Sequence, residues 1–175
     1  MLVEVTSLEQ IPIVRELFQE YADWLGVDLC FQGFEEELRT LPGMYSRPDG
    51  FVYLAYADEK PAGCIALKPL PSEGLRICEM KRLFVRPAYR GSGLGRTLVQ
   101  LCLDEASAIG YDVMRLDTLE RMQTAINLYK SFGFAECSEY YRNPLEDVVY
   151  MEKRLDRKAA NGNGREHGPR SGRGN

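Results

Sequence analysis

Hydrophobic and polar positions alternate along some stretches of the chain and follow a helical spacing along others. Alternating or short apolar runs predict strands over residues 2–6, 51–57, 63–68, 75–85, 113–117, 134–141 and 148–155. Apolar residues three and four positions apart predict helices over residues 7–26, 31–41, 93–109 and 122–132. The elements follow the order β-α-α-β-β-β-α-β-α-β-β, so we predict an α/β (α+β) fold that forms one domain over residues 1–155.

A loop with glycines at alternate positions joins the strand at 75–85 to the helix at 93–109. Its residues are Arg90, Gly91, Ser92, Gly93, Leu94, Gly95 and Arg96. Glycine lets a ligand approach the backbone closely, and the free amides at a helix N-terminus attract anions. The two arginines suit phosphate oxygens. We therefore interpret the loop as a pyrophosphate cradle, and the alternative is a glycine turn that caps a surface helix.

The loop departs from the two best-known phosphate-binding patterns. A dinucleotide fingerprint needs its third glycine at position 96, where this chain has Arg96. A Walker loop needs a lysine before the Ser/Thr and four residues between its framing glycines. Neither pattern fits, so neither a dinucleotide nor a nucleoside triphosphate is the expected ligand.

Two stretches resemble a known family. Residues 79–95, EMKRLFVRPAYRGSGLG, resemble motif A of the GNAT N-acetyltransferases, whose Gln/Arg-x-x-Gly-x-Gly/Ala signature corresponds to Arg90 through Gly95. Residues 125–134, AINLYKSFGF, are similar to the late helix of the family, with its tyrosine and closing Gly-Phe. The resemblance covers residues 1–155. It implies the GNAT fold, a central, mixed, mostly antiparallel sheet with helices on both faces, and it implies acetyl-CoA as co-substrate with an amine as acceptor.

The resemblance also assigns roles to residues. The implied acetyl-CoA contacts are Leu83, Phe84, Val85, Arg90, Gly91, Ser92, Gly93, Leu94, Gly95, Arg96 and Tyr129. In the family the strands splay at this point, which leaves main-chain groups at Leu83 and Val85 free for the thioester carbonyl and the pantetheine arm. The backbone N–H of Leu83 would meet the developing oxyanion, and pre-aimed donors of this kind accelerate reactions by roughly 10² to 10³.

Transfer to an amine also needs a base, because a primary alkyl ammonium has a pKa near ~10.4. Glu79 is our candidate: it lies within an otherwise apolar strand, where some GNAT members carry a general-base glutamate. The alternative is a structural carboxylate paired to Lys81 or Arg82. If so, the base is water or an acidic residue such as Asp117 or Glu120.

Tyr129 is the candidate acid toward the departing thiolate, because the family places a phenol three residues before the Gly-Phe step. The alternative is a half-buried core aromatic residue. The chain departs from the family pattern at Met122, where many members carry an asparagine that contacts the cofactor.

Composition and charge limit the other classes. The chain of 175 residues is 45% hydrophobic and 27% charged, which is ordinary for a globular protein. Residues 156–175 carry five basic and two acidic side chains, and we expect them to form a disordered basic tail. Since the whole chain has a net charge of −4, the domain over residues 1–155 has −7, and we expect no nucleic-acid binding.

No metal site, membrane span or signal peptide is expected. The five cysteines show no C-x-x-C spacing, and the single histidine, His167, lies in the polar tail. No run approaches the ~20 apolar residues of a membrane span, and the N-terminus lacks a signal-peptide pattern, so we expect a cytoplasmic protein. The oligomeric state is open between monomer and homodimer.

Three functions remain. The first is an acetyl-CoA-dependent N-acetyltransferase, an acyltransferase acting on a primary amine of a small molecule or amino acid by direct attack in a ternary complex. The second is a protein lysine or N-terminal acetyltransferase, which would have an open, acidic groove in place of a closed aromatic pocket. The third is a non-catalytic CoA-binding module, in which Glu79 and Tyr129 are structural.

Overall fold

The computed structural model of the protein describes residues 1–29 and 33–156. The predicted tail lies outside the described residues, apart from Asp156, and so do Cys30 and His167.

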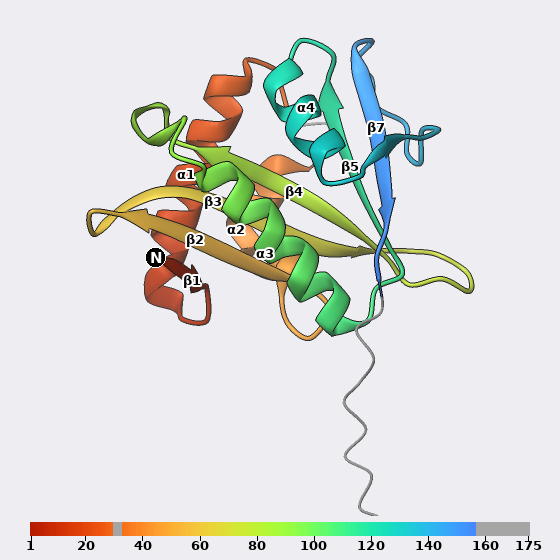
Figure 1. The fold of residues 1–175 in the computed structure, drawn as a ribbon. Helices are drawn as coiled ribbons and strands as arrows, with labels where there is room; N and C mark the ends of the chain where they lie inside the picture. Colours follow the sequence, from red (N-terminus) through yellow and green to blue (C-terminus); the bar gives the residue numbers. More distant parts are fainter. Residues whose placement is uncertain (30–32, 157–175) are drawn as a thin grey trace, which may run out of the picture.

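In the described part of the chain seven strands form one sheet, in the order β1-β2-β3-β4-β5-β7-β6 (Figure 1). Their bounds are β1 (Leu2–Glu4), β2 (Phe51–Ala57), β3 (Lys60–Leu70), β4 (Ile77–Val85), β5 (Val113–Leu119), β6 (Ala135–Glu136) and β7 (Val148–Arg154). Neighbouring strands are antiparallel except for β4 and β5, which are parallel. The prediction of a mixed, mostly antiparallel sheet is confirmed.

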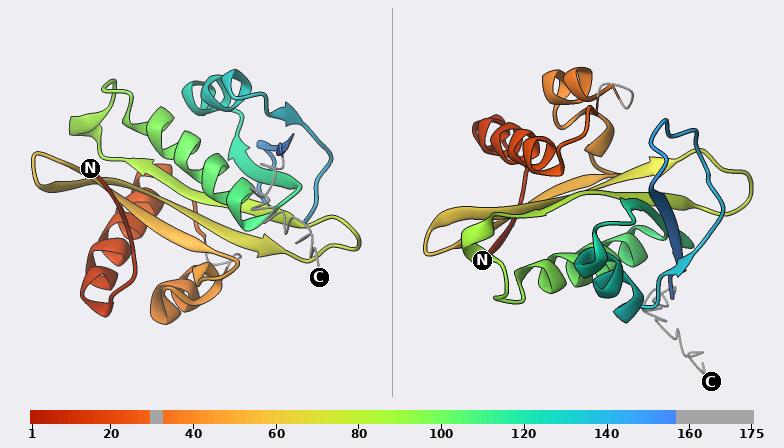
Figure 2. Two further views of the ribbon diagram at one scale, coloured as in Figure 1. Left: turned by 60° about the horizontal axis from the view of Figure 1, so that its bottom comes forward. Right: turned by 90° about the horizontal axis from the view of Figure 1, so that it is seen from above.

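Helices cover both faces of the sheet, as predicted (Figure 2). α1 (Ile11–Leu25) and α2 (Phe34–Thr40) lie on one face, and α3 (Leu94–Ile109) and α4 (Gln123–Ser131) lie on the other. Each face has its own hydrophobic core. Phe18 and Leu54 belong to the core beneath α1 and α2, while Leu98 and Met114 belong to the core beneath α3 and α4.

Two irregularities of β4 shape the site. First, β4 pairs with β5 only from Ile77 to Glu79, opposite Val113 to Arg115, so their remaining lengths are free to diverge. Second, a register shift in the β3–β4 ladder places Arg82 and Leu83 together opposite one residue, Ile65. This is a β-bulge, which bends a strand and leaves backbone groups unpaired.

The element order agrees with the sequence prediction, but most of the bounds differ from it, among them those of β3, α2 and β6. β3 extends back to Lys60 because Asp58 and Glu59, both with positive φ, make a tight turn. α2 begins at Phe34, and residues 31 and 32 of the predicted helix lie outside the described residues. The strand predicted over 134–141 is limited to Ala135–Glu136.

The short β6 has a side-chain cause. Beyond Cys137, whose N–H donates to Tyr150 O (2.9 Å), the chain leaves β7. The hydroxyls of Tyr140 and Tyr141 then donate to carboxylates of β4 and β5, Glu79 and Asp117. The two tyrosines that favoured a strand prediction for this segment therefore cover a cluster of polar side chains.

Among the described helices, none is long and apolar enough to cross a membrane.

Candidate active site

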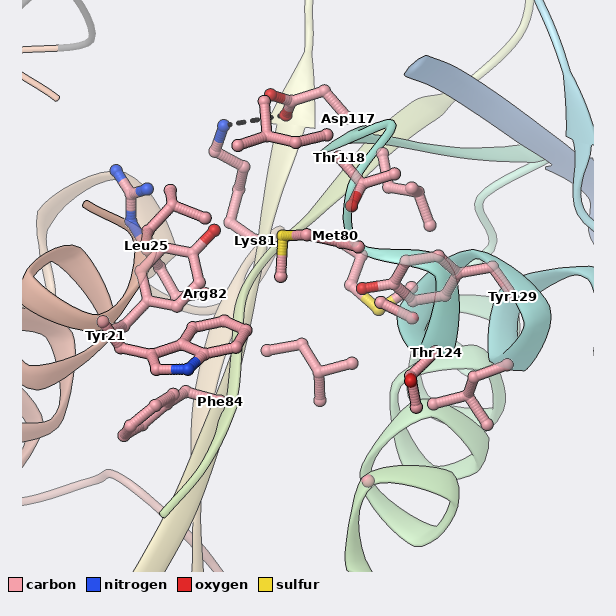
Figure 3. Close-up of a pocket in the computed structure, with 18 of the residues that line it drawn as sticks. Tyr21, Leu25, Met80, Lys81, Arg82, Phe84, Asp117, Thr118, Thr124 and Tyr129 are labelled. Carbon is pink, nitrogen blue, oxygen red and sulfur yellow. Dashed lines mark hydrogen bonds and ion pairs between the residues drawn. The ribbon is translucent and has the colours of Figure 1, made fainter. Parts of the chain in front are cut away.

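A cavity of about 540 Å³ lies where β4 and β5 stop pairing (Figure 3). Its walls include residues 80–85 of β4, residues 116–119 of β5, and residues of α4. Tyr21 and Trp24 of α1 form an aromatic wall, and Asn143 and Leu145 of the β6–β7 link also border the cavity. The cavity thus reaches both faces of the sheet.

The glycine loop borders the cavity at the N-terminus of α3. Gly91 (φ 78°) and Gly93 (φ 83°) are left-handed, a conformation that L side chains rarely adopt. Gly93 is the N-cap, and its carbonyl accepts the N–H of Thr97 (3.1 Å). The backbone N–H groups of the first helical turn, before Thr97, have no partner within the helix and are available to an anion. Gly95 lines the cavity, so a side chain there would narrow it.

The two loop arginines contact protein groups. Arg90 Nε donates to Val85 O (3.0 Å), and its guanidinium lies 4.5 Å from the ring centroid of Trp24. Arg96 Nη2 donates to Ser131 Oγ (2.9 Å), which connects α3 to the end of α4. Their role in binding phosphate stays a prediction. Ser92 Oγ donates to Tyr89 O (2.7 Å) and so stabilises the turn.

The predicted β4 residues lie at the cavity. Leu83, Phe84 and Val85 all line it. Leu83 belongs to the bulge and has no Cα partner in β3 or in β5. The ring of Phe84 packs near Tyr21 and Trp24, at centroid distances of 6.2 and 6.1 Å. The bulge therefore places Leu83 where β4 and β5 separate.

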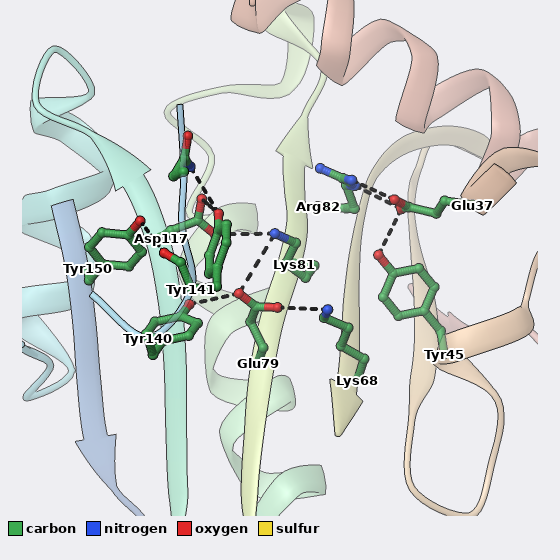
Figure 4. Close-up of polar contacts among 11 residues, drawn as sticks. Glu37, Tyr45, Lys68, Glu79, Lys81, Arg82, Asp117, Tyr140, Tyr141 and Tyr150 are labelled. Atoms are coloured by element: carbon green, nitrogen blue, oxygen red, sulfur yellow. Dashed lines mark hydrogen bonds and ion pairs between the residues drawn. The ribbon is translucent and has the colours of Figure 1, made fainter. Parts of the chain in front are cut away.

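Glu79 is buried in a polar cluster next to the cavity (Figure 4). Its Oε1 accepts the hydroxyl of Tyr140 (2.7 Å), and its Oε2 lies 3.2 Å from Lys68 Nζ. Lys81 Nζ is farther away, at 3.8 Å from Oε1. Only 2% of the Glu79 side chain is exposed, and Glu79 is not among the described residues that line the cavity. It would reach a ligand there through water or through a neighbour.

Asp117 is the carboxylate that lines the cavity directly. Its Oδ1 lies 3.2 Å from Lys81 Nζ, and its Oδ2 accepts the hydroxyl of Tyr141 (2.8 Å). Burial alone would raise the pKa of Asp117, but the charge of Lys81 and these two hydrogen bonds hold it below its usual value. Asp117 is therefore ionised at neutral pH.

Tyr129 is a buried residue of α4 whose hydroxyl faces the cavity (Figure 3). Its ring packs edge-on against Phe134, the phenylalanine of the Gly-Phe step, at 6.0 Å between centroids. Burial raises the pKa of Tyr129 well above its usual value. The phenol therefore keeps its proton at neutral pH and can donate it to a more basic ligand atom. Met122 also lines the cavity.

Sequence reasoning missed Lys68, Tyr140 and Tyr141 as parts of the cluster. Lys68 faces Glu79 because the β3–β4 register pairs the two residues, and this register is not visible locally. The adjacent Tyr140 and Tyr141 form an edge-to-face pair with 5.4 Å between ring centroids. In the sequence, these two residues indicated only a strand. No group of three or more His, Cys, Asp or Glu that could hold a metal exists among the described residues.

Comparison with known proteins agrees with this geometry. Residues 13–134 match the Acetyltransferase (GNAT) family. An uncharacterized N-acetyltransferase of Schizosaccharomyces pombe is 42% identical over 144 residues, which cover 82% of this chain and 87% of the relative. An uncharacterized N-acetyltransferase of Dictyostelium discoideum is 34% identical over 210 residues, which cover 86% and 97%.

Among solved structures, the NatC complex bound to Gag peptide and CoA includes a chain with a TM-score of 0.69 and 21% identity. The match covers 89% of this chain and 98% of that chain, and at this identity it shows the shared fold. The fold and the sequence match define an acyltransferase. The chain belongs to the GNAT family of acetyltransferases, which use acetyl-CoA.

Proposed function

We propose that this N-acetyltransferase transfers the acetyl group of acetyl-CoA to a primary amine of a small molecule or amino acid. The observation that carries the proposal is the cavity itself. Its volume of about 540 Å³ falls within the range of small-molecule sites. Its wall at α1 is aromatic, and Asp117 is the one acidic residue among the described residues that line it. A protein substrate would favour an open, acidic groove.

Acetyl-CoA would lie with its pyrophosphate at the N-terminus of α3, against Gly91, Ser92, Gly93, Leu94 and Gly95, flanked by Arg90 and Arg96. Two observations support this fit. The left-handed glycines leave open space where a side chain would stand, and the first-turn amides can receive phosphate oxygens. The pantetheine arm would follow Leu83, Phe84 and Val85 into the cavity.

Two carboxylates would act on the amine, one by binding its ammonium form and the other by removing its proton. Asp117 lines the cavity and is ionised, so it would hold the acceptor's ammonium, but its low pKa makes it a weak base. Glu79 would take the proton through a water molecule, because Glu79 does not reach the cavity wall. The charges of Lys68 and Lys81 on either side of Glu79 hold its carboxylate in place.

The nitrogen lone pair then attacks the thioester carbonyl, the carbon–sulfur bond breaks, and the nitrogen gives up a further proton to water, which leaves a neutral amide. The backbone N–H of Leu83, in the bulge, would stabilise the negative charge that develops on the carbonyl oxygen. Tyr129 would donate its phenolic proton to the departing sulfur, a role that its cavity-facing hydroxyl supports. The raised pKa of Tyr129 keeps the phenol protonated until that step. The products are an acetylated amine and CoA.

The proposal is tested by measuring free thiol released from acetyl-CoA in the presence of small primary amines, free amino acids or short peptides. We expect release with at least one small amine at a rate that saturates with amine concentration. Release with peptides alone would favour a protein N-acetyltransferase. CoA binding without turnover on any amine would favour a non-catalytic CoA-binding module.

A further inference from the structure

A buried ion pair joins α2 to the bulge of β4 (Figure 4). Arg82 Nε donates to Glu37 Oε1 (2.9 Å), and Arg82 Nη2 donates to Glu37 Oε2 (2.5 Å), so the pair is bidentate. The hydroxyl of Tyr45 donates to the same Oε1 (2.8 Å). The side chains of Arg82 and Glu37 are 2% and 3% exposed, so water does not compete for these bonds.

Aromatic rings enclose the guanidinium as well. Its carbon lies 5.1 Å from the ring centroid of Phe34 and 5.8 Å from that of Tyr21. A planar guanidinium that is bound by a carboxylate and packed between two aromatic rings has little freedom to rotate. The position of the Arg82 side chain is therefore set by α1 and α2, the two helices on one face of the sheet.

The backbone of Arg82 has an unusual conformation. Its φ is +57°, in the left-handed region that L residues other than Asn and Asp rarely adopt. Such a conformation persists only where the surroundings impose it. Here the carbonyl of Arg82 also accepts a bond from Cys64 Sγ (3.4 Å), so both the side chain and the peptide are held.

The peptide between Arg82 and Leu83 carries the N–H that the proposed function uses. Leu83 lies in the bulge and has no Cα partner in either neighbouring strand, so the regular strand register is interrupted at this N–H. We propose that Arg82 is a positioning residue, which uses its buried pair with Glu37 to aim the Leu83 N–H at the thioester carbonyl. This inference rests on the proposed function and adds α2 to the machinery of the site.

The inference can be tested without knowing the acceptor, because acetyl-CoA has the thioester carbonyl and CoA lacks it. Trp24 is the single tryptophan of the chain and lines the cavity, so its fluorescence reports binding of either ligand. A single hydrogen bond changes affinity by about three- to tenfold. We expect wild type to bind acetyl-CoA more tightly than CoA by about this factor.

Two variants weaken the contacts that hold Arg82 to different extents. Tyr45→Phe deletes one hydrogen bond to Glu37 and keeps the ion pair, while Arg82→Lys keeps the charge and loses the bidentate geometry. We expect the preference for acetyl-CoA to shrink in Tyr45→Phe and to disappear in Arg82→Lys, with CoA affinity within twofold of wild type. The control is Val14→Ala, which removes buried packing in α1. It lowers the melting temperature and leaves the preference unchanged.

Three outcomes would overturn the inference. An unchanged preference in both Tyr45→Phe and Arg82→Lys would make the ion pair structural only. An equal loss of affinity for both ligands, in these variants and in Val14→Ala, would mean that lower stability explains the effect. Failure of wild type to bind either ligand would contradict the proposed function itself, and the inference would fall with it.

Discussion

Lys81 Nζ lies 3.2 Å from Oδ1 of Asp117, the carboxylate that lines the cavity. This contact keeps Asp117 ionised in spite of its burial, which suits it to hold an ammonium group and makes it a weak base. Glu79, the predicted base, lies on the other side of Lys81, at 3.8 Å.

Asp117→Asn removes the charge that, in the proposed function, holds the ammonium of the acceptor. Because hydrogen bonds to charged groups contribute about 1.5–3 kcal/mol, we expect the KM for the amine to rise by roughly 10- to 100-fold. The KM for acetyl-CoA should stay within about twofold of the wild-type value, since Asp117 is proposed to contact the acceptor and not acetyl-CoA. Steady-state kinetics with each substrate varied in turn measures the difference.

Glu79→Gln keeps the size of the side chain and one acceptor oxygen but loses basicity. We expect kcat/KM to fall by roughly 10² to 10⁴ at neutral pH and to recover partly at high pH, where the amine loses its proton to solvent. Glu152→Gln, in a half-exposed pair with Arg115, is the matched control and should leave the rate unchanged. A rate for Glu79→Gln within about threefold of wild type, together with a kcat loss in Asp117→Asn, would transfer the role of base to Asp117.

Tyr129→Phe removes the proposed proton donor and keeps the ring that packs on Phe134. We expect kcat to fall by roughly 10² or more while CoA affinity is retained. Tyr111→Phe serves as control: it deletes the hydroxyl that donates to Asp49 O (2.5 Å), outside the cavity lining. That variant should lose stability and keep its kcat. A normal kcat in Tyr129→Phe would make Tyr129 a core aromatic residue.

Gly93→Val tests the phosphate cradle, and Gly74→Val is its control. The two glycines have φ of +83° and +84°, and an added Cβ would meet no atom within 4 Å at either position. A left-handed valine costs at least about 1–2 kcal/mol at each, so both variants should melt earlier by a similar amount. CoA at about 100 times its dissociation constant stabilises a protein by ~2.7 kcal/mol. We expect this thermal shift in wild type and Gly74→Val, and its loss in Gly93→Val.

The buried pair of α2 predicts how stability depends on pH. Burial raises the pKa of Glu37, but the bonds from Arg82 and Tyr45 outweigh burial and lower it below the usual value. A carboxyl with a depressed pKa stabilises the fold above the unfolded pKa of about 4.3, and this stability is lost as pH falls through the folded value.

Glu37→Gln should therefore be less stable than wild type by about 3–5 kcal/mol at pH ~7, with a smaller difference at pH ~3.5. Urea unfolding at the two pH values measures it. Glu136→Gln, in the exposed pair with Lys130, is the control and should change stability by less than about 1 kcal/mol. A difference for Glu37→Gln that stays constant with pH would mean that the carboxyl charge contributes nothing.

Most of the fold could be predicted because each element has a local signal. Apolar spacing located α1 and α3, and the glycines at 26 and 110 marked their ends. The exception, the strand predicted over 134–141, depends on distant partners. Tyr140 and Tyr141 leave the sheet to reach Glu79 and Asp117, which lie 61 and 24 positions away in the chain.

The site was predictable where a short motif carries it and not where tertiary contacts complete it. The glycine loop, Leu83 and Tyr129 belong to such motifs, and Leu83, Gly95 and Tyr129 line one cavity. The pair of Glu37 with Arg82 spans 45 positions, so only the folded chain brings it together. Asp117 lines the cavity because β4 and β5 diverge beyond Glu79, and no local sequence pattern predicts this divergence.

Transfer of a labelled acetyl group tests the central claim most directly. The protein is incubated with acetyl-CoA labelled in its acetyl group and with a mixture of small primary amines, free amino acids and short peptides, and products are identified by mass spectrometry. We predict a labelled N-acetyl product from a small amine or amino acid, formed with an equal amount of CoA. Labelled peptides as the only products, or no labelled amine while acetyl-CoA binds, would contradict the account.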